Sequence, residues 1–400
     1  MKMKRIIPYL LSAFFLTATV LTVGNAGYGG KIKEPDKAVL TEDEPEREMR
    51  GVWVTFMTLD VENEEDKESA FRDKIDTIIS DMTEGGFNTM IVHVRPFCDA
   101  IYKSAYYPWS HIISGRQGED PGFDPLRIIC DRCAEADISV HAWINPYRIS
   151  TASTPAQLSE DNPYMKDGSI GVKVNGETYL DPADERTREL IVSGVIELLE
   201  NYNIDGIHFD DYFYPENCGD FDKERYEAYR ASTSSPLSLD EYRRDNVSSL
   251  IRDVYRAVHS TKSGAVFGVS PQGNMPNNEV LYADVERWCA EPGYIDYICP
   301  QLYFSIDNPI LRYEGALAQW LNAKRHSGLK LYIGLGGYKA GTDADEGTWL
   351  DNDDILRTEV EILRANGTDG FILYSYDSIH DEHNEAEIKN LTDYINSPSQ

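Results

Sequence analysis

Ile204-Asp-Gly-Ile-His-Phe-Asp-Asp-Tyr-Phe-Tyr-Pro215 is the stretch of this 400-residue chain from which its fold is best inferred. It begins as an apolar β pattern and ends in two adjacent carboxylates followed by aromatic residues. If its first seven residues form a strand, alternation places His208 and Asp210 on one face. Ile207 and Phe209 then point to the opposite face, toward covering helices. A strand that carries an Asp to its carboxyl end is how an α/β barrel presents a catalytic group.

Strand-like and helix-like segments alternate on both sides of this stretch. We expect strands at 51–56, 87–96, 138–144, 204–210, 266–270, 294–303, 329–335 and 370–376. We expect helices at 67–83, 124–136, 184–203, 239–261, 279–290, 309–325, 351–366 and 385–395. Eight such units predict an α/β fold of the (β/α)8 TIM-barrel type, with long loops after strands 2, 3 and 4. An open doubly wound sheet is the alternative, but no glycine-rich phosphate loop follows the first strand.

The N-terminal region predicts export. Three basic residues within the first five positions precede an apolar run at 6–23 and small residues up to 26, which is typical of a secretory signal peptide at 1–26. A retained membrane anchor is the alternative. Residues 27–48 are acidic and rich in Gly and Pro, as in a flexible linker, and 49–396 form the catalytic domain. We therefore expect a secreted or cell-envelope, extracytoplasmic protein.

The net charge and the spacing of the cysteines limit the partners and ligands that we expect. The chain has 38 basic and 68 acidic side chains and a formal net charge of −30. Such a chain repels nucleic acid and anionic membrane surfaces, so we expect no nucleic-acid partner and no membrane span after signal cleavage. Cys130 and Cys133 lie three apart without a second pair, which favours buried thiols over a metal site. We expect a monomer without metal or cofactor.

The segments after the predicted strands are rich in Trp, Tyr, Asn, Gln, Arg and Asp. Aromatic faces stack on sugar rings, and amide, carboxylate and guanidinium groups bind hydroxyls. A phosphate site would instead need lysines and a glycine-rich helix N-terminus. We therefore predict a polysaccharide or oligosaccharide substrate. The candidate substrate-binding residues are His93, Arg95, Trp109, Trp143, Asn145, Tyr147, Arg148, His208, Tyr212, Gln272, Gln301, Tyr303 and Tyr376.

Several segments resemble the bacterial glycosyl hydrolase-like family ten. They include Arg50-Gly-Val-Trp-Val54, His141-Ala-Trp-Ile-Asn-Pro-Tyr-Arg148, Asp205-Gly-Ile-His-Phe-Asp-Asp-Tyr-Phe-Tyr-Pro215 and Pro300-Gln-Leu-Tyr303. The resemblance implies a secreted or envelope (β/α)8 protein of bacterial cell-wall and polysaccharide metabolism. It implies a glycoside hydrolase that cleaves O-glycosidic bonds, with peptidoglycan glycan as the leading substrate.

Glycoside hydrolysis needs two carboxyl groups, one of them held protonated to donate to the leaving oxygen. Asp210 is the first candidate because alternation points it inward, and Asp211 is the second. We predict Asp377, after the last strand, as the partner carboxylate. Glu216 and Asp307 are alternatives in loops.

The chitinase-like pattern Asp-x-x-Asp-x-Asp-x-Glu is incomplete in this chain. His208 stands at its second Asp and Tyr212 at its Glu. The acid of the chitinase mechanism is therefore missing, and substrate-assisted cleavage by that arrangement is not expected.

Two other hypotheses stay open. A metal-dependent carbohydrate hydrolase or deacetylase would use His93, His208 and Asp210 as ligands, although no compact motif such as His-Glu-x-x-His is present. A barrel that binds carbohydrate without turnover is the non-enzymatic alternative.

Overall fold

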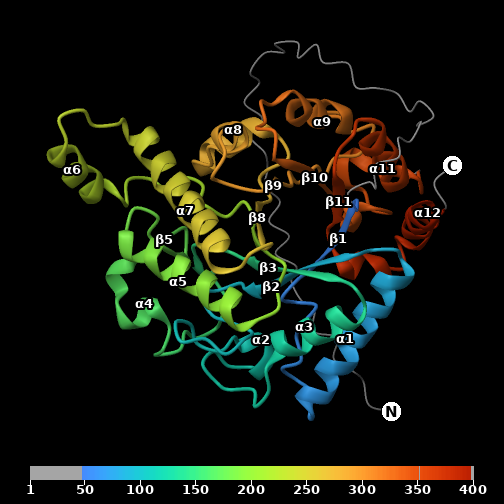
Figure 1. Ribbon diagram of the computed structural model, residues 1–400, viewed down its shortest axis with the longest axis horizontal. Coiled ribbons are helices and arrows are strands. Elements are labelled where there is room, and N and C mark those ends of the chain that lie inside the picture. The colour runs from blue at the N-terminus through green and yellow to red at the C-terminus, as the bar shows by residue number, and fades with distance from the viewer. Residues whose placement is uncertain (1–46, 351, 398–400) are drawn as a thin grey trace. The chain divides into compact units, whose positions relative to one another are not determined.

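The computed structural model describes residues 47–350 and 352–397. The expected signal peptide at 1–26, the expected linker up to residue 46 and the expected helix start at 351 lie outside the described residues. Eight parallel strands close into a barrel in the order β1-β11-β10-β9-β8-β7-β3-β2 (Figure 1), which confirms the predicted (β/α)8 fold. The strands are β1 (Met49–Val54), β2 (Thr89–Arg95), β3 (Ser139–Ile144), β7 (Gly206–Phe209), β8 (Val266–Val269), β9 (Tyr297–Ile298), β10 (Lys330–Leu335) and β11 (Gly370–Leu373).

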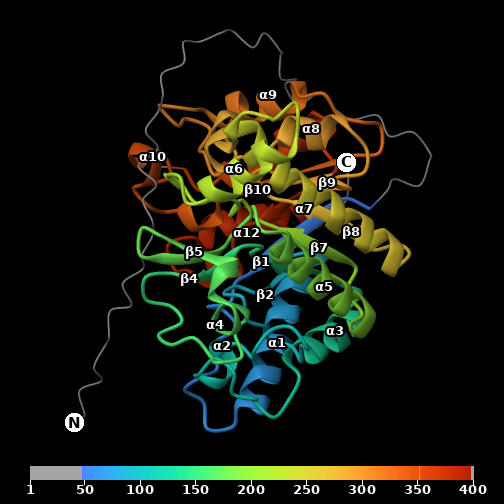
Figure 2. The same ribbon diagram turned by 90° about the vertical axis from the view of Figure 1, so that its left-hand side faces the viewer.

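Helices surround the strands in both views of the molecule (Figure 1, Figure 2). Their apolar stripes face the barrel, as expected for helices that cover a parallel sheet. The main helices are α1 (Lys67–Glu84), α3 (Pro125–Glu135), α5 (Glu185–Asn201), α7 (Leu239–Thr261), α8 (Val285–Ala290), α9 (Tyr313–Asn322), α11 (Ile355–Ala365) and α12 (Glu385–Asn396).

The segments after the second, third and fourth barrel strands are long, as predicted. They carry α2 (His111–Ser114), α4 (Pro163–Lys166) and α6 (Lys223–Ser232), together with a small antiparallel sheet in the order β4-β6-β5. The sequence analysis did not anticipate this sheet, formed by β4 (Arg148–Ser150), β5 (Gly171–Val174) and β6 (Glu177–Leu180). The remaining short elements are α10 (Ala344–Gly347) and the 3-10 turns η1 (Gly168–Ile170), η2 (Met275–Leu281), η3 (Gly337–Lys339) and η4 (Tyr376–His380).

Two predicted elements are shorter than expected. The strand expected at 294–303 has two residues, Tyr297–Ile298, and continues as isolated bridges through Gln301. Pro300 lacks the N–H that a continuous ladder needs at this point. The helix expected at 279–290 divides into η2 and α8.

Side chains inside the barrel form a polar chain. Trp53 Nε1 donates to His208 Nε2 at 3.3 Å, and Tyr297 Oη lies 2.9 Å from Nδ1 of both His208 and His141. The barrel has room for the Tyr297 ring because residue 268 is glycine, where a Cβ would lie 2.0 Å from that ring.

The predicted alternation of the fourth strand is confirmed, because His208 faces this interior while its neighbours Ile207 and Phe209 join the outer apolar core. The six cysteines are buried free thiols. No helix in the described part of the chain is long and apolar enough to cross a membrane.

Candidate active site

Asp210 follows the last residue of β7 and is 4% exposed at the carboxyl end of the barrel. Its Oδ2 accepts hydrogen bonds from Trp143 Nε1, at 3.0 Å, and from Asn145 Nδ2. Its Oδ1 accepts from the backbone N–H of Tyr212 at 3.2 Å. One oxygen is thus held by two side-chain donors and the other by a single backbone group.

The environment of Asp210 favours its neutral form. Burial, followed by the charge of Asp211, raises the pKa of Asp210 to about 7, while Arg148 and the Trp143 hydrogen bond oppose the rise. A carboxyl group with such a pKa is partly protonated at neutral pH, which is the property a general acid requires.

The Asp211 side chain points toward the strands β8 and β9, away from β3. Its oxygens accept from Gln272, which follows β8, and from Gln301, which follows β9, the latter at 3.1 Å. Burial raises the pKa of Asp211, and the two amide donors counteract part of that effect. Two consecutive residues therefore place one carboxyl group toward β3 and the other toward β8 and β9.

Behind Asp210 lies a supporting layer from β2 and β3. The His93 ring stacks on Trp143 with centroids 3.7 Å apart, and His93 Nε2 is 2.9 Å from Asn145 Oδ1. Arg148 also donates to Asn145 Oδ1, and its guanidinium lies over the Tyr212 ring at 5.0 Å. Tyr212 is 47% exposed, so this side of the site offers an aromatic face to solvent.

Three tyrosines form the opposite aromatic side. The Tyr303 ring is 5.7 Å from Tyr338 and 5.5 Å from Tyr374, and the latter two rings are 5.8 Å apart. Tyr303 is one of the candidate substrate-binding residues, and Tyr338 follows the seventh strand expected from the sequence, whereas Tyr374 was not predicted. Alternation from Ile372, which lies inside the barrel, could have identified Tyr374.

Asp377 and Tyr376 form hydrogen bonds with residues other than the acid pair. Asp377 is exposed and accepts a hydrogen bond from Thr58 at 2.8 Å, beside Lys74 of α1. Tyr376 donates to Asp81 of α1 at 2.5 Å. Since β11 ends at Leu373 and η4 begins at Tyr376, the chain turns before these residues and directs them to α1. Tyr376 therefore packs against α1, and among the described residues no hydrogen bond or ion pair joins Asp377 to Asp210. Asp377 as the partner carboxylate stays a prediction.

Arg95 and Tyr147 are also outside the site. The β2–β3 ladder is irregular between His93 and Arg95, so Arg95 leaves the inward register. Its guanidinium is 1% exposed, lies over Tyr107 at 4.8 Å and donates to Pro146 O at 3.1 Å. Tyr147 is 1% exposed in the outer core, and burial raises the pKa of its hydroxyl. Both are structural in this fold.

The remaining candidates lie in loops, where each has its own local contacts or exposure. Trp109 is half-buried and its backbone bridges to Ala100 in the segment after β2. Glu216 is exposed, and Asp307 is exposed and pairs with Arg312. The structure therefore shows neither Glu216 nor Asp307 as a buried partner of Asp210.

The proposed metal ligands do not form one set. Both ring nitrogens of His208 are engaged, by Trp53 and by Tyr297, and burial lowers the pKa of His208 so that the ring is neutral. His93 is engaged by Asn145. Among residues 47–350 and 352–397, no group of three or more His, Cys, Asp or Glu side chains is arranged to hold a metal ion.

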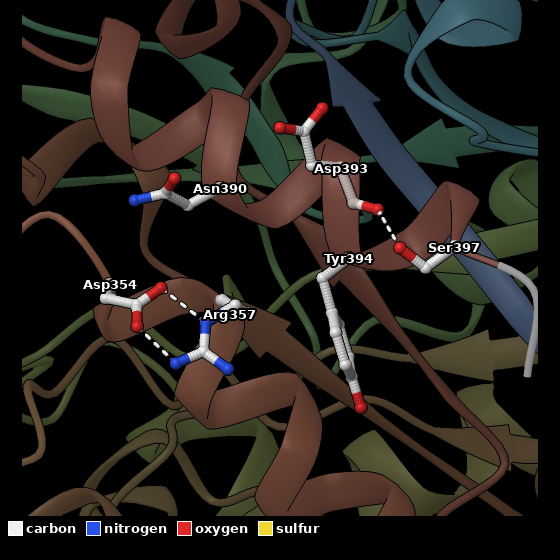
Figure 3. A pocket seen from close by; sticks show the side chains of 6 residues that line it. All are labelled: Asp354, Arg357, Asn390, Asp393, Tyr394 and Ser397. Atoms are coloured by element: carbon white, nitrogen blue, oxygen red, sulfur yellow. Dashed lines mark hydrogen bonds and ion pairs between the residues drawn. The ribbon is translucent and has the colours of Figure 1, made fainter. Parts of the chain in front are cut away.

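A hollow on the outside of the barrel lies between α11 and α12 (Figure 3). It is lined by Asp354, Arg357, Asn390, Asp393, Tyr394 and Ser397. Arg357 donates two hydrogen bonds to Asp354, so its charge is neutralised locally. The buried carboxyl pair lies instead at the barrel mouth.

Comparison with known proteins agrees with this geometry. The family model described as Glycosyl hydrolase-like 10 matches residues 48–351. The chain is 33% identical to glycosyl hydrolase YngK of Bacillus subtilis over an alignment of 335 positions that covers 78% of this chain and 65% of that protein. It is 30% identical to glycosyl hydrolase DigH of Escherichia coli K12 over an alignment of 404 positions that covers 90% of this chain and 89% of DigH. The chain thus spans just under two thirds of the length of YngK.

Solved structures share the fold. The glycoside hydrolase domain of PgaB (BpsB) from Bordetella bronchiseptica aligns with a TM-score of 0.55 at 12% identity, covering 86% of this chain and 99% of that one. The catalytic domain of a β-amylase from Paenibacillus polymyxa aligns with a TM-score of 0.56 at 10% identity, covering 86% and 97%. At these identities the likeness concerns the barrel alone.

Proposed function

The chain belongs to the glycosyl hydrolase-like 10 family, and from this premise we propose that it hydrolyses O-glycosidic bonds of a polysaccharide by carboxylate acid/base catalysis. The observation that carries the proposal is the buried Asp210–Asp211 pair at the barrel mouth. Burial and the neighbouring carboxylate raise the pKa of Asp210 to about 7. A glycosidase needs one carboxyl group that is protonated and another that is charged, and unequal environments provide this difference.

In this proposal Asp210 is the general acid. It transfers its proton to the glycosidic oxygen as the bond to the anomeric carbon breaks. Water then supplies the new hydroxyl group at that carbon, and the proton that this water loses passes to a carboxylate of the pair, which restores the starting protonation state. Asp211, held by the amides of Gln272 and Gln301, is the carboxylate that faces the positive charge developing on the sugar ring.

A polymeric substrate is supported by where exposed apolar side chains lie. In the described part of the chain, every large apolar or aromatic side chain that is strongly exposed belongs to a segment following a barrel strand, on the side of the acid pair. They are Met57, Tyr106, Met165, Tyr212, Val280, Ile310, Tyr338 and Leu350. Tyr106, Tyr212 and Tyr338 among them offer aromatic faces, and several such faces after different strands suit a glycan of more than one sugar unit.

We further propose an exported protein whose leading substrate is bacterial cell-wall glycan, that is, the glycan of peptidoglycan. The signal-like N-terminus and the resemblance to envelope proteins of cell-wall metabolism support this proposal. The net charge of −30 favours a glycan backbone over strongly anionic wall polymers.

The test is reducing-end release by residues 27–400 from a panel of glycans. The panel includes peptidoglycan strands with and without stem peptides, chitin, xylan and α-glucans, and each reaction is run with and without chelator. We expect activity on one glycan class, loss of about 10²–10⁴-fold in Asp210→Asn, and no effect of chelator. Asp377→Asn tests the predicted partner carboxylate in the same assay. Asp76→Asn is the matched control, because it makes the same change at an exposed carboxylate of α1 that pairs with Arg132.

Two outcomes would overturn the proposal. Inhibition by chelator, reversed by added metal, would favour the metal-dependent hydrolase. Sugar binding by a folded protein that cleaves no member of the panel would favour the carbohydrate-binding barrel.

A further inference from the structure

The side-chain amide of Asn145 connects a cation to the acid pair. Arg148 Nη2 donates to Asn145 Oδ1, while Asn145 Nδ2 donates to Asp210 Oδ2. A guanidinium can only donate hydrogen bonds, so it requires the oxygen of the amide on its side. The NH2 group must then face Asp210. A flipped amide would place the NH2 group against the guanidinium, so that two donors would face each other.

His93 reinforces the same orientation. Its Nε2 lies 2.9 Å from Asn145 Oδ1 and must therefore carry the proton. The His93 ring also stacks on Trp143, the second donor to Asp210 Oδ2. Both side-chain donors to this one oxygen are thus held by the layer behind them.

Arg148 is itself held rigidly. Its Nε donates to Pro96 O at 3.0 Å, and its guanidinium lies 4.8 Å from the Phe97 ring and 5.0 Å from the Tyr212 ring. It forms no ion pair with another described side chain, although most arginines in this acidic protein do. Its charge is therefore available to Asp210 and Asp211.

We propose that Arg148 is a positioning residue that acts through Asn145: it secures Oδ2 of Asp210 and so leaves Oδ1 as the oxygen that delivers the proton. This inference rests on the proposed function, because it assigns the support of the same general acid. It goes beyond that function in separating two contributions of one side chain, the orientation of Asn145 and the charge beside the acid pair.

The ionisable groups around Asp210 determine how the activity depends on pH. Asp211 adjoins Asp210, His208 lies on β7, His93 lies on β2 beyond β3, and Tyr212 and Tyr374 border the mouth. Burial lowers the pKa of both histidines well below 6.5 and raises the pKa of Tyr374 to about 12. Arg148 is the cation that lowers the pKa of both carboxyl groups.

Arg148→Met and Arg148→Lys separate the two contributions. In Arg148→Met we expect kcat to fall by about 10²-fold, as for a misplaced catalytic group. The activity profile should also move to higher pH, since loss of the cation raises the pKa of Asp210 and Asp211. In Arg148→Lys the charge remains, so we expect a lower kcat with an almost unchanged profile. Arg357→Met, which removes an arginine from the outer helix α11, is the control for loss of a guanidinium.

A measurement that does not need turnover accompanies the kinetics. The Trp143 indole N–H, assigned by Trp143→Phe, donates to Asp210 and should titrate with it in ¹H–¹⁵N spectra. We expect its midpoint to rise in Arg148→Met and to stay near the wild-type value in Arg357→Met. An unchanged midpoint, or a raised KM with unchanged kcat and pH profile, would overturn the inference. If the wild type cleaves no glycan, the proposed function fails while the midpoint still decides the role of Arg148.

Discussion

Asp210 and Asp211 are adjacent in the chain, yet they bind different partners because β7 ends at Phe209 and the turn that follows directs their side chains to different neighbours. Trp143 and Asn145 hold the first, and Gln272 with Gln301 holds the second. Burial raises the pKa of both, so the protein retains two carboxyl groups in surroundings that oppose their ionisation. Such groups reduce stability in exchange for activity.

Asp210→Asn should therefore stabilise the fold at alkaline pH. The folded-state pKa of about 7 lies above the unfolded value near 3.9, so the folded chain binds this proton more tightly. Folding stability then decreases as pH rises from about 4 to about 7, and the whole cost is present above that range. We expect the substitution to raise the free energy of unfolding by about 1–3 kcal/mol at pH 8 and by much less at pH 4.5. Denaturant unfolding at both values tests this, and an equal effect at both would contradict it.

Gly268→Ala should damage the barrel interior. Its Cβ would lie 2.0 Å from the ring of Tyr297, the residue that connects His208 and His141. We expect destabilisation of about 3 kcal/mol or more, since overpacking of a rigid core is added to the loss of these hydrogen bonds. Gly315→Ala in α9, where the nearest atom is 3.6 Å away, should instead stabilise by about 0.5–1 kcal/mol. Thermal and denaturant unfolding of both variants tests the contrast.

The ends of secondary-structure elements decide which residues reach the mouth. β11 stops at Leu373, and η4 then carries Tyr376 to Asp81 of α1. The ladder between β2 and β3 shifts between His93 and Arg95, which removes Arg95 from the inward face. Each change alters the side on which the following residues lie, because side-chain direction in a strand has a period of two.

Tyr374→Ala and Tyr376→Phe test the end of β11. We expect Tyr374→Ala to raise KM for a glycan about tenfold or more, because it removes a ring of the mouth cluster. Tyr376→Phe should leave kcat and KM unchanged and lower stability by about 1–2 kcal/mol, since the hydroxyl bonded to Asp81 is lost. A large kinetic effect of Tyr376→Phe with unchanged stability would contradict this placement.

In the barrel as a whole, the residues that stabilise the fold and the residues at the mouth lie in different regions. Its outer helices cover the apolar core, while the segments after its strands carry the exposed apolar side chains and the acid pair. This arrangement follows from the topology, because the carboxyl ends of all parallel strands meet at one face.

Tyr338→Ala should therefore impair the cleavage of long glycans more than that of short ones. Tyr338 is 48% exposed and packs on Tyr303 and Tyr374. We expect kcat/KM to fall about 5–50-fold for long glycans and much less for the shortest cleavable oligosaccharide. Equal losses for all lengths would show that the ring contributes at the point of cleavage instead.

The amino-acid sequence by itself predicted the eight β–α units, the long segments after three strands, and the inward direction of His208 and Asp210. These features follow from hydrophobic periodicity and alternation, which are local properties of the chain. The sequence also indicated the amide and indole groups that surround the acid pair, because they follow neighbouring parallel strands.

The tertiary structure alone decided the hydrogen-bond partners of each carboxyl group, the burial that raises their pKa values, and the direction of Tyr376 toward α1. It also brought together Tyr303, Tyr338 and Tyr374, which come from three different strand exits. Strand length, register shifts and desolvation depend on packing between distant segments. A local pattern contains no information about where such a strand stops or how much water remains around a charge.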